Sequence, residues 1–357
     1  MPKKSLPSLG FLHPYIETRF NEIESKLYPK NHLWGCDAIV DCKDWDASQV
    51  HTLKYRIPKV LEKLFNHHFF RNSPGIQVEF AAWKLSGTLD VIYSVCGPLT
   101  LSRFYKKTQL VSWVFQLPHD ATTSILSSYQ VKNLKKHKGF CCLTPKAEKD
   151  FSKYSVSQFI PWCIDLELFD GKPAIEKPKE PFFLATGKTG RDYNTLIKAA
   201  ENVDAEIRII APAEQKSRNL PKNIKWFDTS IDPPDKRIDY PTLRQWYAQC
   251  IAVCIPLTGN TDDTCGYTNM LEAMAMAKPI LMTKSGSLHI NPEQRGFGLL
   301  VNPKDPVDWA SSMSKLLKDY NNYKRMGMVG REIAESEFSL ETFNNTIINF
   351  LKNCLKK

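Results

Sequence analysis

Hydrophobic residues in the second half of the chain form short unbroken runs that alternate with segments of helical spacing. The unbroken runs predict strands buried on both faces, because a strand with one solvated face would alternate apolar and polar residues. In the segment 192–203 apolar residues recur at helical spacing, which predicts a helix. Strands that alternate with helices in this way predict a parallel sheet covered by helices. The expected strands are 181–186, 205–211, 223–227, 251–257, 279–283 and 298–301, and further expected helices are 241–250, 267–277 and 306–326.

The first half of the chain shows a weaker form of the same pattern. Its expected strands are 89–95, 110–117, 138–144 and 157–163, and its expected helices are 127–138 and 145–154. The fold class is therefore α/β, with two Rossmann-like doubly wound domains that face each other across a ligand cleft. The segment 166–180, rich in proline and charge, is the expected linker. The expected organisation is a first Rossmann-like domain over 1–165, the linker over 166–180, a second Rossmann-like domain over 181–340, and a C-terminal helix over 341–357 that can pack back on the first domain.

The net charge of +10 is concentrated in the first half. Residues 1–160 hold 22 Lys and Arg against 13 Asp and Glu, a net of +9, whereas residues 161–357 hold 26 against 25, a net of +1. A basic half predicts an anionic partner, such as lipid headgroups, a phosphorylated substrate or nucleic acid. The alternative is an ordinary lysine-rich surface. Nucleic acid is not expected, because the lysines are not interleaved with an aromatic stacking platform.

The cysteines do not follow the spacing of a metal site. No C-x-x-C pair and no Cys/His ladder occurs, so no metal is expected. Most of the thiols fit small buried hydrophobes in a reducing compartment. The sequence has no run of the ~18 apolar residues that span a bilayer, and its N-terminus lacks the apolar core of a signal peptide. The expected location is the cytoplasm.

One carboxylate, Glu272, lies in the middle of the very apolar segment 267–277. Burial of an unpaired carboxylate is costly or raises its pKa strongly, so Glu272 needs hydrogen-bond donors. Two adjacent sugar hydroxyls can donate to one carboxylate. The helix also begins directly after a polar loop, so its free N–H groups form an anion site near Glu272. A ribose at Glu272 and a phosphate at the helix start fit a nucleotide. The alternative is that a neighbouring backbone group or basic side chain satisfies Glu272.

The stretch GYTNMLEAMAMAKPILMT (266–283) resembles the G-x-T-x-x-L-E-A-M-A-x-x-K-P signature of the family 4 retaining glycosyltransferases, which have the GT-B fold. GKTGRDYNTLIKAA (187–200) is similar to the phosphate-binding loop and following helix of that family. VCIPL (253–257) resembles the strand before the signature loop, and residues 295–319 resemble the closing strand and helix. In the first half, residues 141–169 resemble the end of the acceptor domain. The resemblance implies a metal-independent transferase with a nucleotide-diphosphate sugar as donor substrate and no cofactor.

The resemblance also implies roles for residues of the second half. Gly187 and Lys188 stand where the family has a Gly-Arg pair, and Arg191 stands where it has the lysine of a Lys-Gly pair. Lys188 and Arg191 would neutralise the departing diphosphate, whose charge grows as the glycosidic bond breaks. Glu272 would bind the donor ribose. Backbone N–H groups for phosphate and sugar would come from Gly266, Thr268 and Asn269.

Two further positions complete the expected site. His119 follows a strand of the first half, where the family often has a histidine that touches the donor sugar. The alternative for His119 is a surface histidine after a proline turn. Thr264 stands where the family has a first glutamate, eight residues before Glu272. Asp262 or Asp263 is the candidate replacement, and a solvated loop carboxylate is the alternative. The expected catalytic residues are His119, Lys188 and Arg191.

The sequence thus predicts a retaining glycosyltransferase that moves a sugar from a nucleotide-diphosphate sugar to an acceptor hydroxyl. The missing glutamate leaves open a nucleotide-sugar-binding subunit without catalysis, and another GT-B enzyme such as a nucleotide-sugar epimerase is a further alternative.

In the segment 127–140, four lysines alternate with Tyr129, Val131 and Leu134. This pattern predicts a basic amphipathic helix that can lie on an anionic membrane surface. The alternative is a solvated helix face on a domain that handles soluble substrates.

Overall fold

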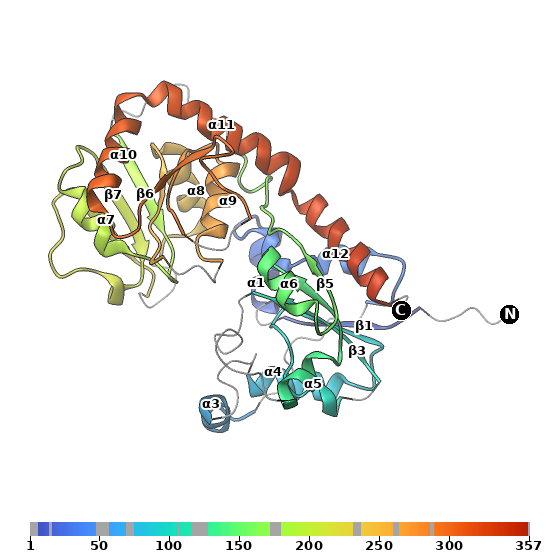
Figure 1. Ribbon diagram of the computed structural model, residues 1–357. Coiled ribbons are helices and arrows are strands. Elements are labelled where there is room, and N and C mark those ends of the chain that lie inside the picture. The colour runs from blue at the N-terminus through green and yellow to red at the C-terminus, as the bar shows by residue number, and fades with distance from the viewer. Residues whose placement is uncertain are drawn as a thin grey trace. The chain divides into compact units, whose positions relative to one another are not determined.

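The chain folds into two compact units, seen in the computed structural model of Figure 1. Each unit is built on a parallel sheet with helices, so the α/β class expected from the sequence is confirmed. Unit 1 comprises Met1–Asn21, Lys30–Pro161 and Glu341–Lys357, and unit 2 comprises Glu22–Pro29 and Trp162–Leu340. The structure describes residues 6–13, 16–47, 57–68, 75–105, 107–115, 128–171, 180–230, 237–259, 264–285 and 289–355.

The sheet of unit 2 has the strand order β11-β10-β9-β6-β7-β8, and every neighbouring pair is parallel. Within this sheet the chain forms β6 first and then β7 and β8 toward one edge. It then returns to the other side of β6 and forms β9, β10 and β11 toward the opposite edge. This reversal between β6 and β9 is the switch point of a doubly wound sheet. Every one of these strands overlaps a segment that the sequence predicts as a strand. Their bounds are β6 Phe182–Thr186, β7 Glu206–Ala211, β8 Ile224–Asp228, β9 Val253–Ile255, β10 Ile280–Thr283 and β11 Gly298–Val301.

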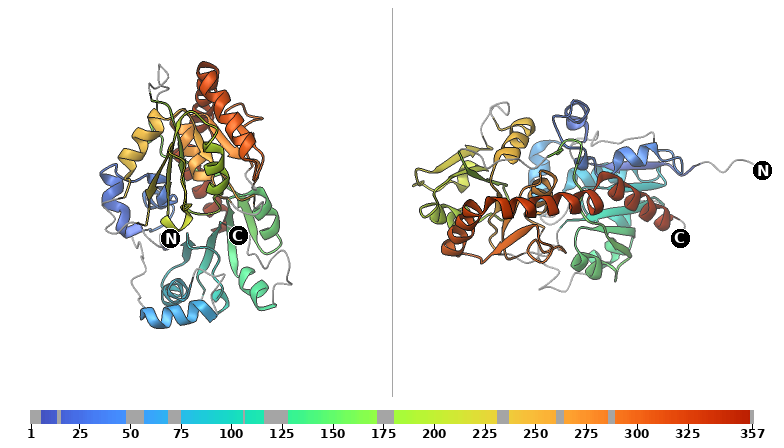
Figure 2. Two further views of the ribbon diagram at one scale, coloured as in Figure 1. Left: turned by 90° about the vertical axis from the view of Figure 1, so that its left-hand side faces the viewer. Right: turned by 90° about the horizontal axis from the view of Figure 1, so that it is seen from above.

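Helices cover both faces of this sheet (Figure 2). α7 packs against α10, and α9 packs against α11. Four of the helices begin at an aspartate, Asp192, Asp239, Asp305 or Asp319, whose carboxylate accepts a hydrogen bond from a backbone N–H of the first turn. The bounds are α7 Tyr193–Ala200, α8 Tyr240–Gln249, α9 Tyr267–Ala275, α10 Pro306–Lys318 and α11 Tyr320–Glu337, with the short helix η4 at Ala213–Gln215.

The segment 306–326, expected to be one helix, is divided between two helices. α10 ends at Lys318 and α11 begins at Tyr320, with Asp319 between them. The backbone of Asp319 is not helical, and its carboxylate accepts a hydrogen bond from the N–H of Asn322 at 3.4 Å. The apolar spacing continues across the break, and for this reason periodicity alone predicted a single helix.

The first residues of the expected linker belong to the packed body of unit 2. Phe169 is fully buried, and its ring packs edge-on against Tyr247 with the ring centroids 6.3 Å apart. Nη1 of Arg331 donates hydrogen bonds to the carbonyl oxygens of Phe169 at 2.6 Å and Ala275 at 2.5 Å. Unit 2 therefore extends back into the segment that proline and charge marked as a linker, because Leu168 and Phe169 within that segment are buried.

The sheet of unit 1 follows the order of the chain, β1-β2-β3-β4-β5, and is parallel throughout. Four of these strands overlap the strands expected from the sequence, and β1 was not expected. β1 is a run of four residues, too short to be recognised as a strand by periodicity. The bounds are β1 Leu9–Leu12, β2 Val91–Ser94, β3 Gln109–Val114, β4 His137–Cys142 and β5 Val156–Phe159.

The C-terminal helix α12 (Leu340–Leu355) packs on this sheet (Figure 1). The ring of Phe343 stacks on Trp113 of β3, with the centroids 5.7 Å apart. A Cβ at Gly139 of β4 would lie 2.5 Å from Sγ of Cys354, so only glycine allows α12 to approach this closely. The remaining helices are α1 Ile16–Glu24, η1 Lys30–Leu33, α2 Cys36–Asp41, α3 Lys59–His68, α4 Ile76–Leu85, η2 Ser102–Phe104, α5 Ser128–Leu134 and α6 Pro145–Phe151.

The basic helix expected near residue 130 is shorter than predicted, and its apolar flank is not free. α5 ends at Leu134 and β4 begins at His137, so Lys138 lies on a strand. The side chain of Leu134 packs against the buried cluster of Phe140 and Phe151. This side chain is half-buried and contributes to the core of unit 1.

Candidate functional site

The switch point of unit 2 brings two loops together. The loop after β6 contains Gly187 and Arg191, and the loop after β9 contains Leu257. Backbone hydrogen bonds join the loops: the N–H of Asp192 donates to the carbonyl of Pro256 at 3.0 Å, and the N–H of Thr258 donates to the carbonyl of Gly190 at 2.9 Å. In open α/β sheets ligands bind outside the carboxyl ends of the strands at such a point. The candidate site is therefore at this edge of the sheet.

The guanidinium of Arg191 organises the loop after β6. Nε donates to the carbonyl of Thr186 at 3.1 Å, Nη1 donates to the carbonyl of Thr189 at 2.8 Å, and Nη2 donates to Oδ1 of Asn269 on α9. The guanidinium lies against Gly187, whose φ is +128°, and a Cβ at that position would be 2.5 Å from Nη2. Glycine is thus required here by both the backbone conformation and the close approach of Arg191.

Lys188 is the exposed cation of the same loop. Its carbonyl oxygen accepts a hydrogen bond from Nε2 of Gln215 at 2.5 Å, which joins the loop to the segment that follows β7. The backbone of Lys188 is therefore fixed while its ammonium group faces solvent. A cation placed in this way is available to an anionic ligand.

Glu272 is buried in the middle of α9, with only 3% of its surface exposed. Oε2 accepts a hydrogen bond from the hydroxyl of Tyr247 at 2.7 Å and a longer one from Nδ2 of Asn269 at 3.4 Å. Nδ2 of Asn269 also donates to Oγ1 of Thr186 at 2.5 Å. A continuous polar chain therefore runs from Arg191 through Asn269 and Glu272 to Tyr247.

The second oxygen of Glu272, Oε1, accepts no hydrogen bond from the residues that the structure describes. Burial raises the pKa of Glu272 to about 7, and the hydrogen bonds from Tyr247 and Asn269 and the charge of Arg191 oppose that rise. The partners inside the chain thus compensate for burial only in part. Donors from a ligand at Oε1 would stabilise the charged form further.

The N-terminus of α9 faces the same edge of the sheet. Its first turn follows Gly266, which has a φ of +87° and no room for a side chain, because a Cβ would lie 2.8 Å from Cγ2 of Ile255. The N–H groups of Thr268 and Asn269 belong to this first turn, where helix geometry provides no intrahelical acceptor. A helix end of this kind attracts anions through its N–H groups and its dipole.

The structure gathers most of the expected residues at one place in unit 2. Gly187, Arg191, Asn269 and Glu272 are joined by the contacts above, and Lys188 is on the same loop. His119 and Asp263 lie outside the described residues, as does Asp262. Within the described residues, no group of three His, Cys, Asp or Glu side chains has the arrangement of a metal site.

Two residues of the polar chain were not anticipated from the sequence. Thr186 is the last residue of β6 and Tyr247 lies on the buried side of α8. Tyr247 is fully buried, and a buried tyrosine hydroxyl needs an acceptor. That requirement is the signal in the sequence, but it does not say which acceptor is used.

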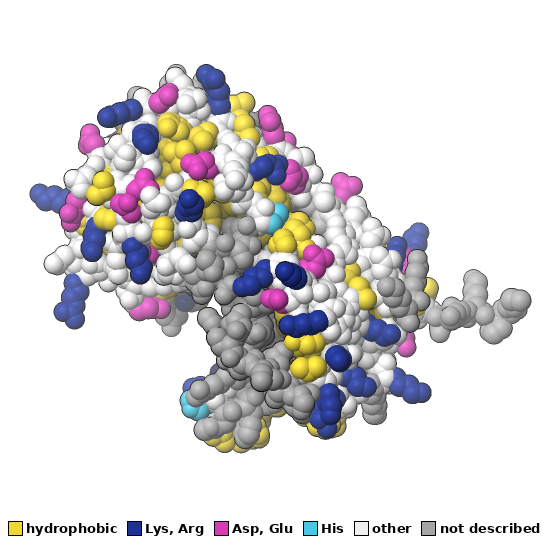
Figure 3. Space-filling model, viewed as in Figure 1, with side chains coloured by type: hydrophobic (Ala, Val, Ile, Leu, Met, Phe, Trp, Pro, Cys, Tyr) yellow, Lys and Arg dark blue, Asp and Glu magenta, His cyan; other side chains and the backbone are white. Residues whose placement is uncertain are grey.

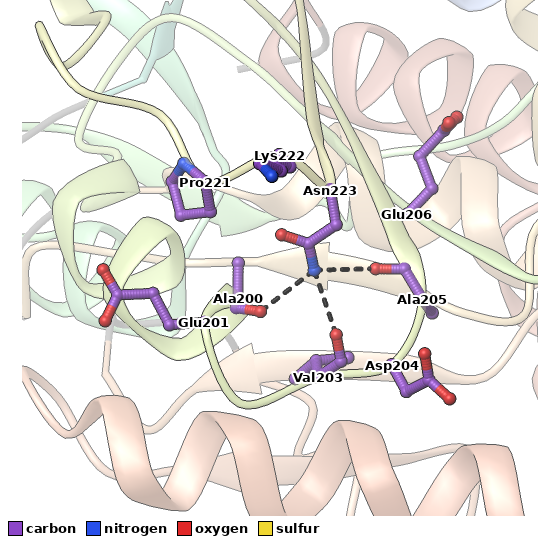
Figure 4. A pocket seen from close by; sticks show the side chains of 9 residues that line it. All are labelled: Ala200, Glu201, Val203, Asp204, Ala205, Glu206, Pro221, Lys222 and Asn223. Atoms are coloured by element: carbon purple, nitrogen blue, oxygen red, sulfur yellow. Dashed lines mark hydrogen bonds between the residues drawn. The ribbon is translucent and has the colours of Figure 1, made fainter.

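A separate cavity of about 530 Å³ lies at the other edge of the same sheet (Figure 4). It is formed where β7 and β8 begin, so it is remote from the carboxyl ends of the strands. At its centre, Nδ2 of Asn223 donates to the carbonyl oxygens of Ala200, Val203 and Ala205 at 2.9, 3.0 and 3.0 Å. These hydrogen bonds hold the turns together, which gives Asn223 a structural role at this cavity.

Part of unit 2 matches a known family model. The family model Glycosyl transferases group 1 matches residues 190–319, which include Arg191, Asn269 and Glu272. A comparison with curated proteins found no match.

The solved structures that match share the fold at low sequence identity. Sucrose-phosphate synthase from Thermosynechococcus elongatus has a TM-score of 0.70 at 16% identity, over 98% of this chain and 99% of that one. HepE from Anabaena in complex with UDP and glucose has a TM-score of 0.63 at 15% identity, over 97% and 100% of the two chains. WaaG, a glycosyltransferase involved in lipopolysaccharide biosynthesis, has a TM-score of 0.58 at 11% identity, over 96% and 99%. These likenesses confirm the GT-B fold.

Proposed function

We propose that the protein is a retaining glycosyltransferase that moves a sugar from a nucleotide-diphosphate sugar to an acceptor hydroxyl. The observation that carries this proposal is the buried polar chain from Arg191 to Tyr247, which leaves one oxygen of Glu272 open at the switch point of a doubly wound sheet. The match of residues 190–319 to Glycosyl transferases group 1 supports the same activity. The structure of HepE with UDP and glucose supports a nucleotide sugar as the donor.

In this proposal the donor lies across the N-terminus of α9. The ribose hydroxyls donate to Oε1 of Glu272, which compensates for the burial of its charge. The diphosphate accepts hydrogen bonds from the N–H groups of Thr268 and Asn269 and contacts the exposed ammonium of Lys188. Arg191 adds positive charge and holds Asn269 in place.

The proposed transfer occurs on one face of the sugar. The bond from the anomeric carbon to the diphosphate breaks while the bond to the acceptor oxygen forms on the same side, so the anomeric configuration is retained. The departing phosphate oxygen takes the proton of the acceptor hydroxyl. The protein contributes positioning and the positive charge of Lys188 and Arg191, which interact more strongly with the diphosphate as its charge grows. We propose this step without a metal ion or a cofactor, because these cations take the charge-neutralising role.

A ligand screen followed by a product assay tests the proposal. Thermal shift of the full chain is measured with UDP-, GDP-, ADP- and dTDP-sugars, and each stabilising donor is then incubated with candidate acceptors and analysed by NMR at the anomeric carbon. The expected result is stabilisation by one donor class and a product of retained configuration. Binding without turnover would instead indicate a nucleotide-sugar-binding subunit, and an epimerised donor would indicate an epimerase.

We also propose that the enzyme works in the cytoplasm and associates peripherally with anionic membrane surfaces. All ten cysteines are free thiols, which suits a reducing compartment. Among the described residues, no helix combines the length and the apolar character required to cross a bilayer. The excess positive charge of the first half supports an anionic surface as partner. The test is sedimentation with anionic vesicles. The fraction of protein that sediments should fall when salt is added.

A further inference from the structure

Helix α3 of unit 1 turns its apolar side chains to solvent. Val60, Leu61, Leu64 and Phe65 are 79%, 44%, 52% and 38% exposed. Residues three and four apart share one side of a helix, so these side chains form a continuous apolar stripe. Exposed apolar residues that occur singly are normal, but a stripe of this kind indicates an interaction surface.

One side of α3, which carries Glu62 and Asn66, is partly buried. Glu62 and Asn66, which are one turn apart, are less exposed than the apolar stripe. Oδ1 of Asn66 accepts a hydrogen bond from the N–H of Ile76 at 2.8 Å, which ties the end of α3 to the start of α4. A surface helix of a globular protein normally buries its apolar side and exposes its polar side. α3 does not bury its apolar side, and Lys59 and Lys63 on its polar side are exposed as well.

Two exposed aromatic side chains lie on α4, which contacts α3, and on η2, which contacts α5. Trp83 on α4 is 48% exposed and Phe104 on η2 is 57% exposed. Each is paired with a cation: Nζ of Lys84 is 5.0 Å from a ring centroid of Trp83, and Cζ of Arg103 is 5.0 Å from the centroid of Phe104. An aromatic ring beside a cation is well suited to the boundary between lipid and water.

Figure 1 shows α3, α4 and α5 together at one end of unit 1. η2 contacts α5. The buried carboxylate of Glu79 on α4 accepts hydrogen bonds from Thr100 and Leu101, so the segment that leads into η2 is fixed to α4. We call this surface the α3–η2 face, defined by Val60, Leu61, Leu64, Phe65, Trp83 and Phe104.

The charge around the α3–η2 face has one sign. Every exposed charged residue of α3, α4, η2 and α5 that the structure describes is a lysine or an arginine. In Figure 3, dark-blue and yellow side chains lie close together at this end of the unit. The exposed cations are Lys59, Lys63, Lys84, Arg103 and Lys132, with Lys135 and Lys136 directly after α5.

We propose that the α3–η2 face docks unit 1 on a membrane that contains anionic lipids. The α3 stripe and the two aromatic rings enter the interface, and the surrounding cations contact the lipid headgroups. An apolar stripe alone would suit a protein partner as well. Here the exposed charged residues of α3, α4, η2 and α5 that the structure describes are all cations, and the one acid of α3, Glu62, is half-buried. This arrangement is complementary to an anionic bilayer. This proposal identifies the surface for the membrane association proposed above. It replaces α5 by α3 as the inserting helix, and it does not depend on the transfer reaction.

Vesicle sedimentation with matched variants tests the apolar part of the face. The full chain is mixed with vesicles of phosphatidylcholine alone or of equal parts phosphatidylcholine and phosphatidylglycerol. The double variant Val60→Ser, Leu64→Ser should reduce binding to the anionic vesicles by roughly tenfold or more. Val307→Ser on α10 is the control, since Val307 is 76% exposed but lies in unit 2. This control should bind like the wild type.

The charged and aromatic parts of the face have their own tests. Lys59→Gln with Lys63→Gln should weaken binding by roughly fivefold for each lysine, whereas Lys315→Gln with Lys318→Gln on α10 should have little effect.

Lipids with brominated chains quench tryptophans that enter the bilayer. The quenching should be smaller in Trp83→Phe than in the wild type if Trp83 enters the interface.

Several results would overturn the proposal. They are an absence of wild-type binding, equal binding to neutral vesicles, and binding that the α3 variant does not change. The wild type could instead form a dimer in light scattering and fail to bind vesicles. If Val60→Ser, Leu64→Ser then abolished the dimer, the face would join two copies of the chain. Thermal shift with the nucleotide sugar, measured on the same variants, should remain unchanged and confirms that they are folded. Donor binding and vesicle binding can therefore fail independently.

Discussion

Two buried glutamates, Glu79 in unit 1 and Glu272 in unit 2, have very different surroundings. Glu79 is completely buried, and both of its oxygens are occupied. Oε1 accepts hydrogen bonds from the N–H of Thr100 at 2.5 Å and from its hydroxyl at 2.9 Å. Oε2 accepts from the N–H of Leu101 at 3.2 Å and from the hydroxyl of Tyr105. The chain itself thus supplies all the donors that this carboxylate needs.

The donors to Glu272 are fewer and reach one oxygen only. Tyr247 and Asn269 both donate to Oε2, and burial still raises the pKa of Glu272 to about 7. A carboxylate with both oxygens bound holds loops together, because removal of its charge leaves several donors unsatisfied. A carboxylate with an open oxygen at a switch point is available to a ligand. Burial alone therefore does not identify a binding residue, whereas incomplete hydrogen bonding does.

The largest effect is expected from Glu79→Ala. The N–H groups of Thr100 and Leu101 and the hydroxyl of Tyr105 would lose their acceptor, and each unsatisfied buried donor costs about 1–3 kcal/mol. We expect a loss of about 3 kcal/mol or more in the stability of unit 1, measured by urea unfolding. Hydrogen exchange of the Thr100 and Leu101 amides should accelerate. A loss below about 1 kcal/mol would show that Glu79 is not the structural carboxylate of this pair.

Glu272→Gln should act on the ligand and leave the fold intact. Loss of the charge-assisted hydrogen bonds to the ribose is expected to cost about 1.5–3 kcal/mol, which is at least a tenfold loss of nucleotide-sugar affinity or turnover. Calorimetric titration with the donor found in the screen measures it. Glu332→Gln, an exposed site on α11, is the control. Wild-type kinetics in the Gln variant would make Glu272 structural, like Glu79.

Arg191→Ala, and less severely Lys188→Ala, should lower kcat more than they raise KM. The diphosphate gains charge on the way to the transition state, so a cation beside it stabilises the transition state more than the bound substrate. We therefore expect roughly a tenfold loss in kcat for Arg191→Ala. Steady-state kinetics with Arg191→Lys as the conservative variant measures the effect. A rise in KM alone would show that these cations only hold the donor.

The smallest expected effects are on how stability and donor affinity depend on pH. An ordinary glutamate titrates near 4.5 and Glu272 near 7, so the folded state holds this proton more tightly than the unfolded chain. The contribution of Glu272 to the free energy of unfolding therefore falls as the pH rises from 4.5 to 7 and stays low above that range. Glu272→Gln has no charge to bury. Its stability relative to the wild type should increase over the same range in urea titrations.

Donor affinity should change with pH in the opposite direction. Ribose hydroxyls donate to the charged carboxylate, so wild-type affinity should rise a few-fold as the pH increases through about 7. The affinity of Glu272→Gln should be flat over the same range. A wild-type profile parallel to that of the variant would assign the titration to another group.

The fold of unit 2 was predictable from local patterns. Its strands are continuous apolar runs, and its helices begin at aspartate caps such as Asp192 and Asp305, which are visible in the sequence. The isolation of Glu272 between alanines and methionines was visible as well. Unit 1 was less predictable, because β1 is short and Leu134 of the expected apolar flank of α5 packs against the core.

The sequence by itself determined where the elements of unit 2 lie and that Glu272 needs donors, because both depend on residues close together in the chain. Tertiary structure decided which donors reach it: Tyr247 is 25 residues away, and the partners Thr186 and Asn269 are 83 residues apart. Tertiary structure also decided the orientation of α3. Periodicity places the apolar residues on one side of a helix, but only contacts made elsewhere, such as Asn66 with Ile76, determine whether that side faces the core or the solvent.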